Sequence, residues 1–397
     1  MTQSSVIRET FSNREGILRL IPVFVPRRFS KAGHRLRLHP DDYYALGTKR
    51  GAMKERWFSS VIAAMNGDDA APDEGMSYVA VSDDIREKIS LKDFVEELGS
   101  EIIGETLMQK YGTWPMYSKF FDYSEPLFHH LHLDFEAAAR VGRLGKPEAY
   151  YYPPQMNNYA GTSPYTYFGF SPDVTKEEVR ERLLDYENRD IRITELSRAY
   201  RIQLGTGWYT PPGVVHAPGS YLTYEPQWNS DVNSVYENIT ADEVYPYEFL
   251  DENCPEDKKH DVDYIISLMD WEKNIDPDYR KHYFRPPITA SEDEKHLEKW
   301  VAYANDYIGA KELTVFPGQT VTVKDNAAYG CIFLQGHGKF GVYDAEAAIM
   351  LRFGQMSADE YFVSEQAAKK GVTIVNKSLW EPIVMLKHFA NNNPDTP

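Results

Sequence analysis

The chain has very few cysteines and no long apolar segment. Only Cys254 and Cys331 occur among its 397 residues, which is too few for a disulfide framework. No apolar run approaches the roughly 20 residues that a helix needs to cross a bilayer. The polar start MTQSSVIRETF also lacks the apolar centre of a secretion signal. These features predict a cytoplasmic protein.

Basic charge is scarce relative to acidic charge. The sequence has 43 Lys and Arg against 60 Asp and Glu, which gives a net charge of −17. A protein of this charge is repelled by phosphate, so nucleic acid and anionic membranes are excluded as expected partners. No internal repeat occurs at solenoid spacing, and the short polar tail NNNPDTP is the only low-complexity stretch.

Aromatic residues are abundant, and they favour β structure. They make up 14% of the chain, with 28 Tyr and 19 Phe, and such residues are enriched in strands. The first 90 residues read as short strands and loops. One helix is expected to begin after Ser90, with apolar residues at helical spacing over 91–103, and another after Thr175, where Glu178 completes a capping box. The stretch VDYIISLMDW predicts a further short helix.

Three histidines and one glutamate form a candidate metal site. His130 and His132 flank Leu131, so in an extended segment both imidazoles point to the same side. Glu148 begins an aromatic stretch that reads as a strand beside the first. His216 lies in PPGVVHA, ahead of another alternating stretch. Such a set suits a divalent transition ion; the alternative is that these are ordinary core or surface residues.

The order of the motifs resembles the type I mannose-6-phosphate isomerases, which are metal-dependent cupins. In that family a Lys precedes a QxHPxxE segment, followed by GK[TP]E, by PxGxxHAxG, and by a Glu nine residues after the last His. Here the same order runs Lys119, His130, His132, Glu136, Lys146, Glu148, His216 and Glu225. The resemblance implies a mainly β bicupin, with two β-barrel or jelly-roll domains and a few inserted helices.

Domain boundaries follow from the same comparison. We expect an N-terminal catalytic cupin with the metal site and helical insertions over 1–230, a crossover segment over 231–308, and a C-terminal cupin-like domain over 309–397. In the last domain HGK contains only His337, so it is expected to be structural or to serve dimerisation, without a metal. Barrel edges can pair between chains, which leaves a homodimer open.

The resemblance also implies which residues bind the metal and which move protons. The metal ligands are expected to be His130, His132, Glu148 and His216, around one divalent ion, with zinc as the first expectation and Mn, Fe, Ni or Co as alternatives. The catalytic residues are expected to be Glu225, Lys119, Lys146 and Asp231.

Each of these catalytic residues has an expected role. Glu225 is the candidate base, and Lys119 or Lys146 would hold or protonate the substrate oxygen, with Asp231 orienting one of them. The alternative for either lysine is a salt bridge to a neighbouring glutamate.

A stretch rich in Tyr, Asn and Pro, YYYPPQMNNYAGTSPYTYFGF, follows the GKPE motif. Tyr hydroxyls and Asn amides can bond sugar hydroxyls while the rings stack on the apolar face of the sugar. An ordinary aromatic β core is the alternative. The expected substrate contacts are Tyr150, Tyr152, Asn158 and Tyr159.

The departures from the family pattern bear on the substrate. The first metal-side residue is usually Gln, but here it is His130. A Ser that helps hold the substrate phosphate is replaced by Phe128, and a catalytic Arg after the retained pair Ser230 and Asp231 is replaced by Val235. Apolar side chains cannot pair with a phosphate dianion. An unphosphorylated carbohydrate is therefore expected.

Three function classes fit this sequence. The first is a metal-dependent aldose-ketose isomerase that transfers a proton by way of an enediol. The second is a cupin oxygenase or lyase that uses iron or manganese in the same ligand set. The third is a sugar-binding cupin in which the ion is structural and no reaction is catalysed.

Overall fold

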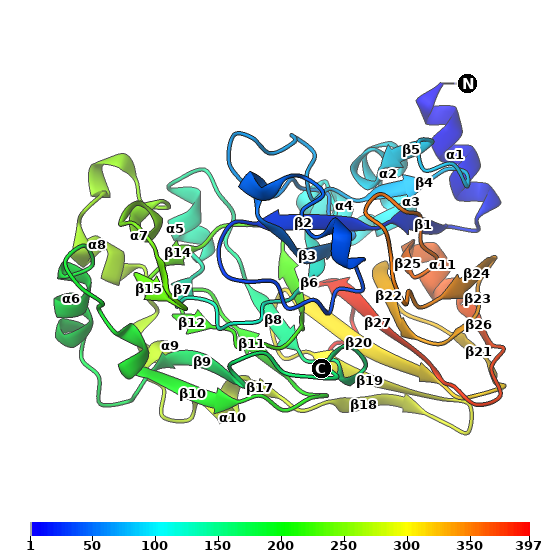
Figure 1. Cartoon of the computed structure of the whole chain (residues 1–397). Coiled ribbons are helices and arrows are strands. Elements are labelled where there is room, and N and C mark those ends of the chain that lie inside the picture. The colour runs from blue at the N-terminus through cyan, green and yellow to red at the C-terminus, as the bar shows by residue number, and fades with distance from the viewer. Residues whose placement is uncertain (1) are drawn as a thin grey trace.

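Four antiparallel sheets are stacked face to face along the long axis of the molecule (Figure 1). The computed structural model describes residues 2–397. Side chains of the five-stranded and seven-stranded sheets share one apolar core, and those of the nine-stranded and four-stranded sheets share another. A third core fills the space between the seven-stranded and nine-stranded sheets. The fold is thus two β units that pack back to back.

The first β unit consists of the five-stranded and seven-stranded sheets. The five-stranded sheet runs, from edge to edge, β10 (Ser197–Arg201), β9 (Tyr165–Phe170), β12 (His216–Ala217), β7 (His130–Leu131) and β14 (Ser234–Val235). The seven-stranded sheet runs β17 (Phe284–Arg285), β11 (Gly207–Thr210), β8 (Glu148–Tyr151), β13 (Thr223–Trp228), β6 (Met116–Phe121), β3 (Ala52–Phe58) and β2 (Val23–Arg27).

The second β unit consists of the nine-stranded and four-stranded sheets, and a small hairpin forms a two-stranded sheet of its own. The nine-stranded sheet runs β18 (Ile288–Glu292), β19 (His296–Ala302), β20 (Ile308–Val315), β27 (Ile383–Ala390), β22 (Tyr329–Gln335), β25 (Glu360–Val363), β1 (Ile17–Ile21), β4 (Tyr78–Ala80) and β5 (Lys88–Ser90). The four-stranded sheet runs β21 (Thr320–Val323), β26 (Val372–Asn376), β23 (His337–Phe340) and β24 (Tyr343–Glu346), and the hairpin pairs β15 (Ile239–Thr240) with β16 (Glu243–Val244).

The N-terminal strand crosses to the second unit. Residues of β1 pair with β25, so Ile17 lies opposite Val363. The domain boundaries expected at 230 and 308 stay a prediction, although the first strands of the chain complete a sheet built mostly from its last hundred residues.

Period-two alternation in β6, β8 and β13 sends successive side chains to different cores. On β6, Phe121 joins the core of the first unit and Phe120 the core between the units; on β8, Tyr150 and Tyr151 divide in the same way. Because neighbours point to opposite faces, Lys119 points into the first unit together with Phe121. This register is what delivers charged groups to the interior.

Within residues 2–397, eleven α-helices cover the edges and outer faces of the sheets. Those near the five-stranded sheet pack on its outer side, where Leu131 and Val215 share an apolar cluster with Val179 and Ile265. No helix among residues 2–397 is long and apolar enough to span a bilayer. The helices are α1 (Gln3–Asn13), α2 (Leu91–Leu98), α3 (Ser100–Ile103), α4 (Glu105–Tyr111), α5 (Phe135–Ala139), α6 (Lys176–Leu184), α7 (Glu248–Asp251), α8 (Val262–Ser267), α9 (Trp271–Asn274), α10 (Tyr279–Tyr283) and α11 (Glu365–Lys370).

Several local expectations are confirmed, and two are wrong. The side chain of Ser90 caps α2 and the Thr175 capping box opens α6, but the helix expected over 91–103 breaks at Gly99, whose φ is +54°. The start of the chain was expected to hold only strands and loops, yet α1 forms there. Its buried Ile7 and Phe11 lie on one face, four residues apart.

Candidate metal centre

Three histidines meet on adjacent strands of the five-stranded sheet. His130 on β7 lies directly opposite His216 on β12, and His132 follows two residues after His130. Ring centroids are 4.2 Å apart for His130 and His216 and 4.9 Å apart for His130 and His132. Their candidate ligand atoms all lie within 4.8 Å of one another, and all three residues are buried. The expectation that both imidazoles of HxH face the same side is confirmed.

Each imidazole is held in one tautomer by the backbone. Nδ1 of His130 lies 2.9 Å from the carbonyl oxygen of Phe128, and Nδ1 of His216 lies 2.8 Å from that of Val214. Nδ1 of His132 lies 2.7 Å from the carbonyl oxygen of Val232. A carbonyl only accepts, so each Nδ1 carries the proton and each Nε2 presents a lone pair. Backbone carbonyls orient metal-binding histidines in this way.

Glu148 faces these nitrogens from the other sheet. Its Oε2 lies 3.1 Å from Nε2 of His132, and its Oε1 lies 3.2 Å from Nε2 of His216. With Nδ1 protonated, neither contact contains a hydrogen, so Oε1 of Glu148 and Nε2 of His216 are buried acceptors without a donor. Oε2 of Glu148 and Nε2 of His132 lie 3.0 and 3.2 Å from Nζ of Lys146. The strand that begins at Glu148 was expected beside that of His130; this was wrong, because β8 lies in the seven-stranded sheet.

Lone pairs that converge in a buried space repel one another unless a cation lies between them. Three imidazole nitrogens and one carboxylate match the donor set of Zn²⁺ and related divalent ions. Burial lowers the pKa of His132 to about 3, and burial followed by the neighbouring histidines lowers the pKa of His130 well below its usual value. Both imidazoles are therefore neutral, as ligation requires. The residues present fit a divalent metal ion.

A chain of alternating buried charges leads away from Glu148. Lys146 Nζ lies 3.0 Å from Glu148 Oε2 and 3.4 Å from Glu225 Oε1. Lys119 Nζ lies 3.2 Å from Glu225 Oε1 and 3.9 Å from Glu55 Oε1. Glu225 and Lys119 are paired residues on β13 and β6, so the sheet register itself sets this contact.

The charges shift one another's pKa. Burial, then the nearby Glu148 carboxylate, raises the pKa of Glu225 to about 8. Burial alone would lower the pKa of Lys146, but Glu148 and Glu225 raise it above its ordinary value. Burial would likewise raise the pKa of Glu148, and Lys146 followed by His132 holds it well below the usual range. The lysine and Glu148 are thus ionised.

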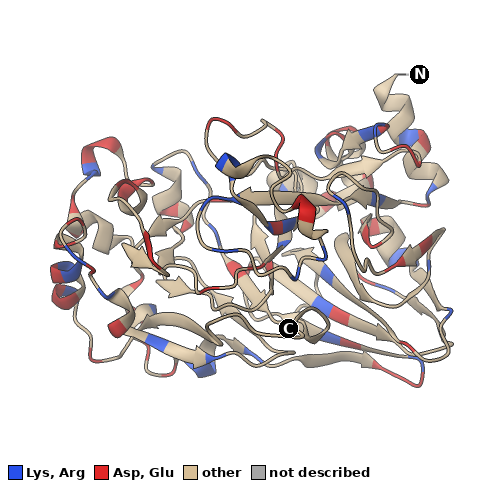
Figure 2. Cartoon of the chain, in the orientation of Figure 1, with Lys and Arg blue, Asp and Glu red and all other residues tan. Residues whose placement is uncertain are grey.

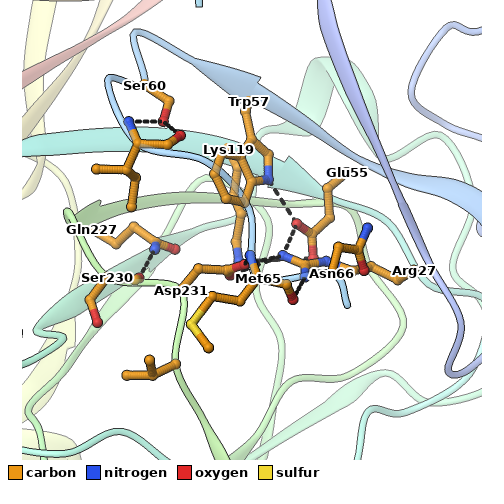
Figure 3. Close-up of polar contacts among 12 residues, drawn as sticks. Arg27, Glu55, Trp57, Ser60, Met65, Asn66, Lys119, Gln227, Ser230 and Asp231 are labelled. Carbon is orange, nitrogen blue, oxygen red and sulfur yellow. Dashed lines mark hydrogen bonds and ion pairs between the residues drawn. The ribbon is translucent and has the colours of Figure 1, made fainter. Parts of the chain in front are cut away.

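The far end of the charge chain joins the expected residue Asp231 to Arg27 and Glu55, which sequence reasoning missed (Figure 3). Arg27 donates to Glu55 at 3.0 Å and to both oxygens of Asp231 at 2.9 and 3.0 Å. Glu55 also accepts from Trp57 Nε1 at 2.8 Å. Asp231 was expected to orient a lysine; its bonded partners are instead Arg27 and the backbone N–H of Met65, at 2.9 Å. The available signal was the charged KER run inside an otherwise apolar strand.

A cavity of about 570 Å³ opens beside this cluster. Both sheets contribute to it, and so does the segment that follows β14. Of the expected catalytic and metal residues, six line it: Lys119, His130, His132, Lys146, Glu225 and Asp231.

The expected sugar-binding residues divide into two groups. Tyr150 lines the cavity. Tyr152 is fully buried, Asn158 is exposed, and Tyr159 is half exposed with its hydroxyl donating to the carbonyl of Gly33. These three lie outside the cavity lining. Glu136, part of the motif comparison, is exposed on α5 and pairs with Arg140.

The second β unit has no comparable cluster among residues 2–397, where the three histidines above form the one group with metal-ligand spacing. His337 is exposed on β23. Acidic and basic side chains are interspersed along the elements (Figure 2).

Solved structures of other proteins share this fold. The mannose 6-phosphate isomerase from Bacillus subtilis matches 94% of this chain and 99% of its own, with a TM-score of 0.63 and 16% identity. The chain has the fold of the mannose-6-phosphate isomerases. The Salmonella typhimurium enzyme, solved with substrate and zinc, matches 94% of this chain and 99% of its own at a TM-score of 0.60 and 11% identity.

This mannose-6-phosphate isomerase fold is a mainly β, cupin-type fold, as the sequence predicted. Neither a protein-family model nor a curated protein sequence matches the chain. At such low identity the likeness establishes the fold, and the chemistry has to be argued from the buried histidines and their surroundings.

Proposed function

We propose that this protein is a metal-dependent aldose-ketose isomerase that acts on an unphosphorylated sugar or sugar derivative. The observation that carries the proposal is the position of Glu225. Its carboxylate lies in a cavity wall between two lysines and next to Glu148, so a proton acceptor and two oxygen-binding cations stand beside the metal-binding histidines.

Different side chains of the site would carry out different parts of the proton transfer. A bound divalent ion, held by His130, His132, Glu148 and His216, would polarise the carbonyl or hydroxyl oxygen of the sugar.

In its ionised form, Glu225 would take the proton from the hydroxyl-bearing carbon and return it to the neighbouring carbonyl carbon. The proton of that hydroxyl would move to the former carbonyl oxygen, so aldose becomes ketose with no other reactant. Lys119 and Lys146 would donate to the oxygens on which negative charge develops.

The solved structures that share this fold include mannose 6-phosphate isomerases, whose name states a phosphosugar substrate. Here every cation that lines the cavity is already paired with a carboxylate of the chain, and Val235 and Phe128 are apolar. These features support an unphosphorylated substrate.

The test uses zinc-loaded protein and a panel of unphosphorylated aldoses in D₂O, with NMR detection of deuterium at the carbons flanking the carbonyl. We expect conversion to the ketose in air and under argon alike. Glu225→Gln should lower the rate by about 10²- to 10⁴-fold at unchanged zinc content. Glu136→Gln, a change at an exposed position, is the matched control and should leave the rate unchanged.

Two results would contradict the proposal. The first is a fully metal-loaded protein that converts no sugar, and the second is a Glu225→Gln variant that keeps the wild-type rate. A reaction that stops under argon would indicate oxygen chemistry in place of isomerisation.

A further inference from the structure

We infer that the substrate ends in an apolar group at the carbon farthest from its carbonyl, as in a 6-deoxy sugar, and that this end rests on an apolar wall beside His130. The inference rests on the proposed function and deepens it, because it names the substrate class. The apolar wall is defined by six cavity-lining residues: Phe29, Leu127, Phe128, Val235, Tyr245 and Phe249.

The apolar wall adjoins the metal centre directly. Val235 on β14 lies opposite His130 in the sheet, and the ring of Phe128 is 5.6 Å from that of His130 at an interplanar angle of 81°. Both residues are almost fully buried by the protein alone. A sugar whose carbonyl oxygen lies near the imidazoles therefore has this wall within reach of its other carbons.

The aromatic part of the wall is packed, and its one polar group is the hydroxyl of Tyr245. The ring centroids of Phe29 and Phe128 are 5.2 Å apart, and those of Phe128 and Tyr245 are 4.8 Å apart, both edge to face. The Tyr245 hydroxyl donates to Glu243 at 2.7 Å. The only hydroxyl on the wall already donates to Glu243, so a substrate hydroxyl placed there would find only the acceptor capacity that remains on this one oxygen.

No free cation is available for a phosphate. The cavity lining has four basic side chains other than histidine and five carboxylates. Arg27, Lys119 and Lys146 are bound in the charge chain, and Arg28 pairs with Asp69. A phosphate dianion would have to compete with a carboxylate for one of these cations, and a methyl group would not.

The cavity is thus polar on one side and apolar on the other. The charge chain offers donors and acceptors to the reacting end of a sugar, whereas the wall favours a carbon without oxygen. A site that leaves a buried hydroxyl unpaired discriminates against it by about tenfold or more.

Binding of non-reacting sugar alcohols to the zinc-loaded protein tests the inference without relying on turnover. Matched pairs differ only at the last carbon: rhamnitol against mannitol and fucitol against galactitol, in D and L forms, together with mannitol 6-phosphate. By calorimetry we expect the deoxy member of at least one pair to bind about tenfold or more tightly than its parent, and the phosphate not to bind.

Equal or tighter binding of the parent, binding of the phosphate, or no binding by any deoxy member would overturn the inference. If the deoxy alcohol binds selectively and no deoxy sugar is isomerised, the proposed reaction fails while the substrate class holds. If phosphorylated or hydroxymethyl sugars are isomerised preferentially, the reaction holds and the substrate class fails.

Variants of the apolar wall test whether this wall causes the preference for the deoxy sugar alcohol. Val235→Thr adds a hydroxyl at nearly constant size and should reduce the preference for the deoxy member several-fold, whereas Val235→Ala, which stays apolar, should retain it. Should Val235→Thr fail to fold, Phe128→Tyr adds a hydroxyl to the same wall. A folded hydroxyl variant with the wild-type preference would overturn the assignment of the wall.

Discussion

The protein should bind one zinc ion per chain, and this ion should stabilise the folded state through its contacts with the three histidines. A ligand at a hundredfold excess over its Kd adds about 2.7 kcal/mol to the free energy of unfolding. With an unfolding entropy of about 2.1 cal/mol/K per residue, the 397 residues give about 0.8 kcal/mol/K, so the expected rise in Tm is about 3 °C. Metal-stripped protein titrated with zinc in a thermal-unfolding assay measures this rise, and elemental analysis measures the stoichiometry.

The matched pair of variants is His216→Ala and His129→Gln. His216 contributes a candidate ligand nitrogen, so its loss should abolish the zinc-dependent rise in Tm. His129 is equally buried, but its Nδ1 lies 2.8 Å from Glu237, away from the other three; its variant should keep the rise, whatever its own Tm. Equal zinc-dependent rises in both variants would refute the four-residue site.

Three further predictions concern stability. Burial lowers the pKa of His388 to about 3, so only the unfolded chain takes up its proton as the pH falls from about 6.5 towards 3, and the stability present above pH 6.5 is lost in that window. Between pH 7.5 and 4.5, the free energy of unfolding measured by urea titration should therefore fall by about 2.7 kcal/mol less in His388→Asn than in the wild-type protein. Equal losses in the two proteins would contradict this prediction. Asp325→Asn should cost about 3–5 kcal/mol, because Asp325 bridges the buried Lys311 and Lys387 at 2.7 and 2.6 Å. A cost below 1 kcal/mol in urea unfolding would show that Glu298, which also pairs with both lysines, is a sufficient counter-charge. Thr175→Ala should cost about 1 kcal/mol through loss of the α6 cap, and an unchanged urea midpoint would refute it.

Sequence reasoning succeeded where a local rule acts within a few residues. The Thr175 capping box and the helix after Ser90 follow from hydrogen bonds between residues three apart. The common face of His130 and His132 follows from the geometry of an extended chain. Such rules need no knowledge of the rest of the molecule.

Sequence reasoning failed where a residue's contact partners come from distant segments of the chain. The strand of Glu148 was expected beside that of His130, but the two lie in facing sheets. Arg27 and Glu55 were missed because the fold brings Arg27 within hydrogen-bond distance of both Glu55 and Asp231, and Asp231 lies 204 positions later in the chain. Local periodicity contains no information about which strands become neighbours.

The sequence by itself determined the donor types, their order along the chain and the β character of the fold, since each depends on side-chain chemistry or on short-range periodicity. Only the tertiary structure decided that Glu148 meets the histidines from the opposite sheet, that the lysines are held in an alternating chain of buried charges, and that one side of the cavity is apolar. These depend on strand pairing and sheet stacking, in which contacts between residues far apart in sequence are selected by burial of the whole core.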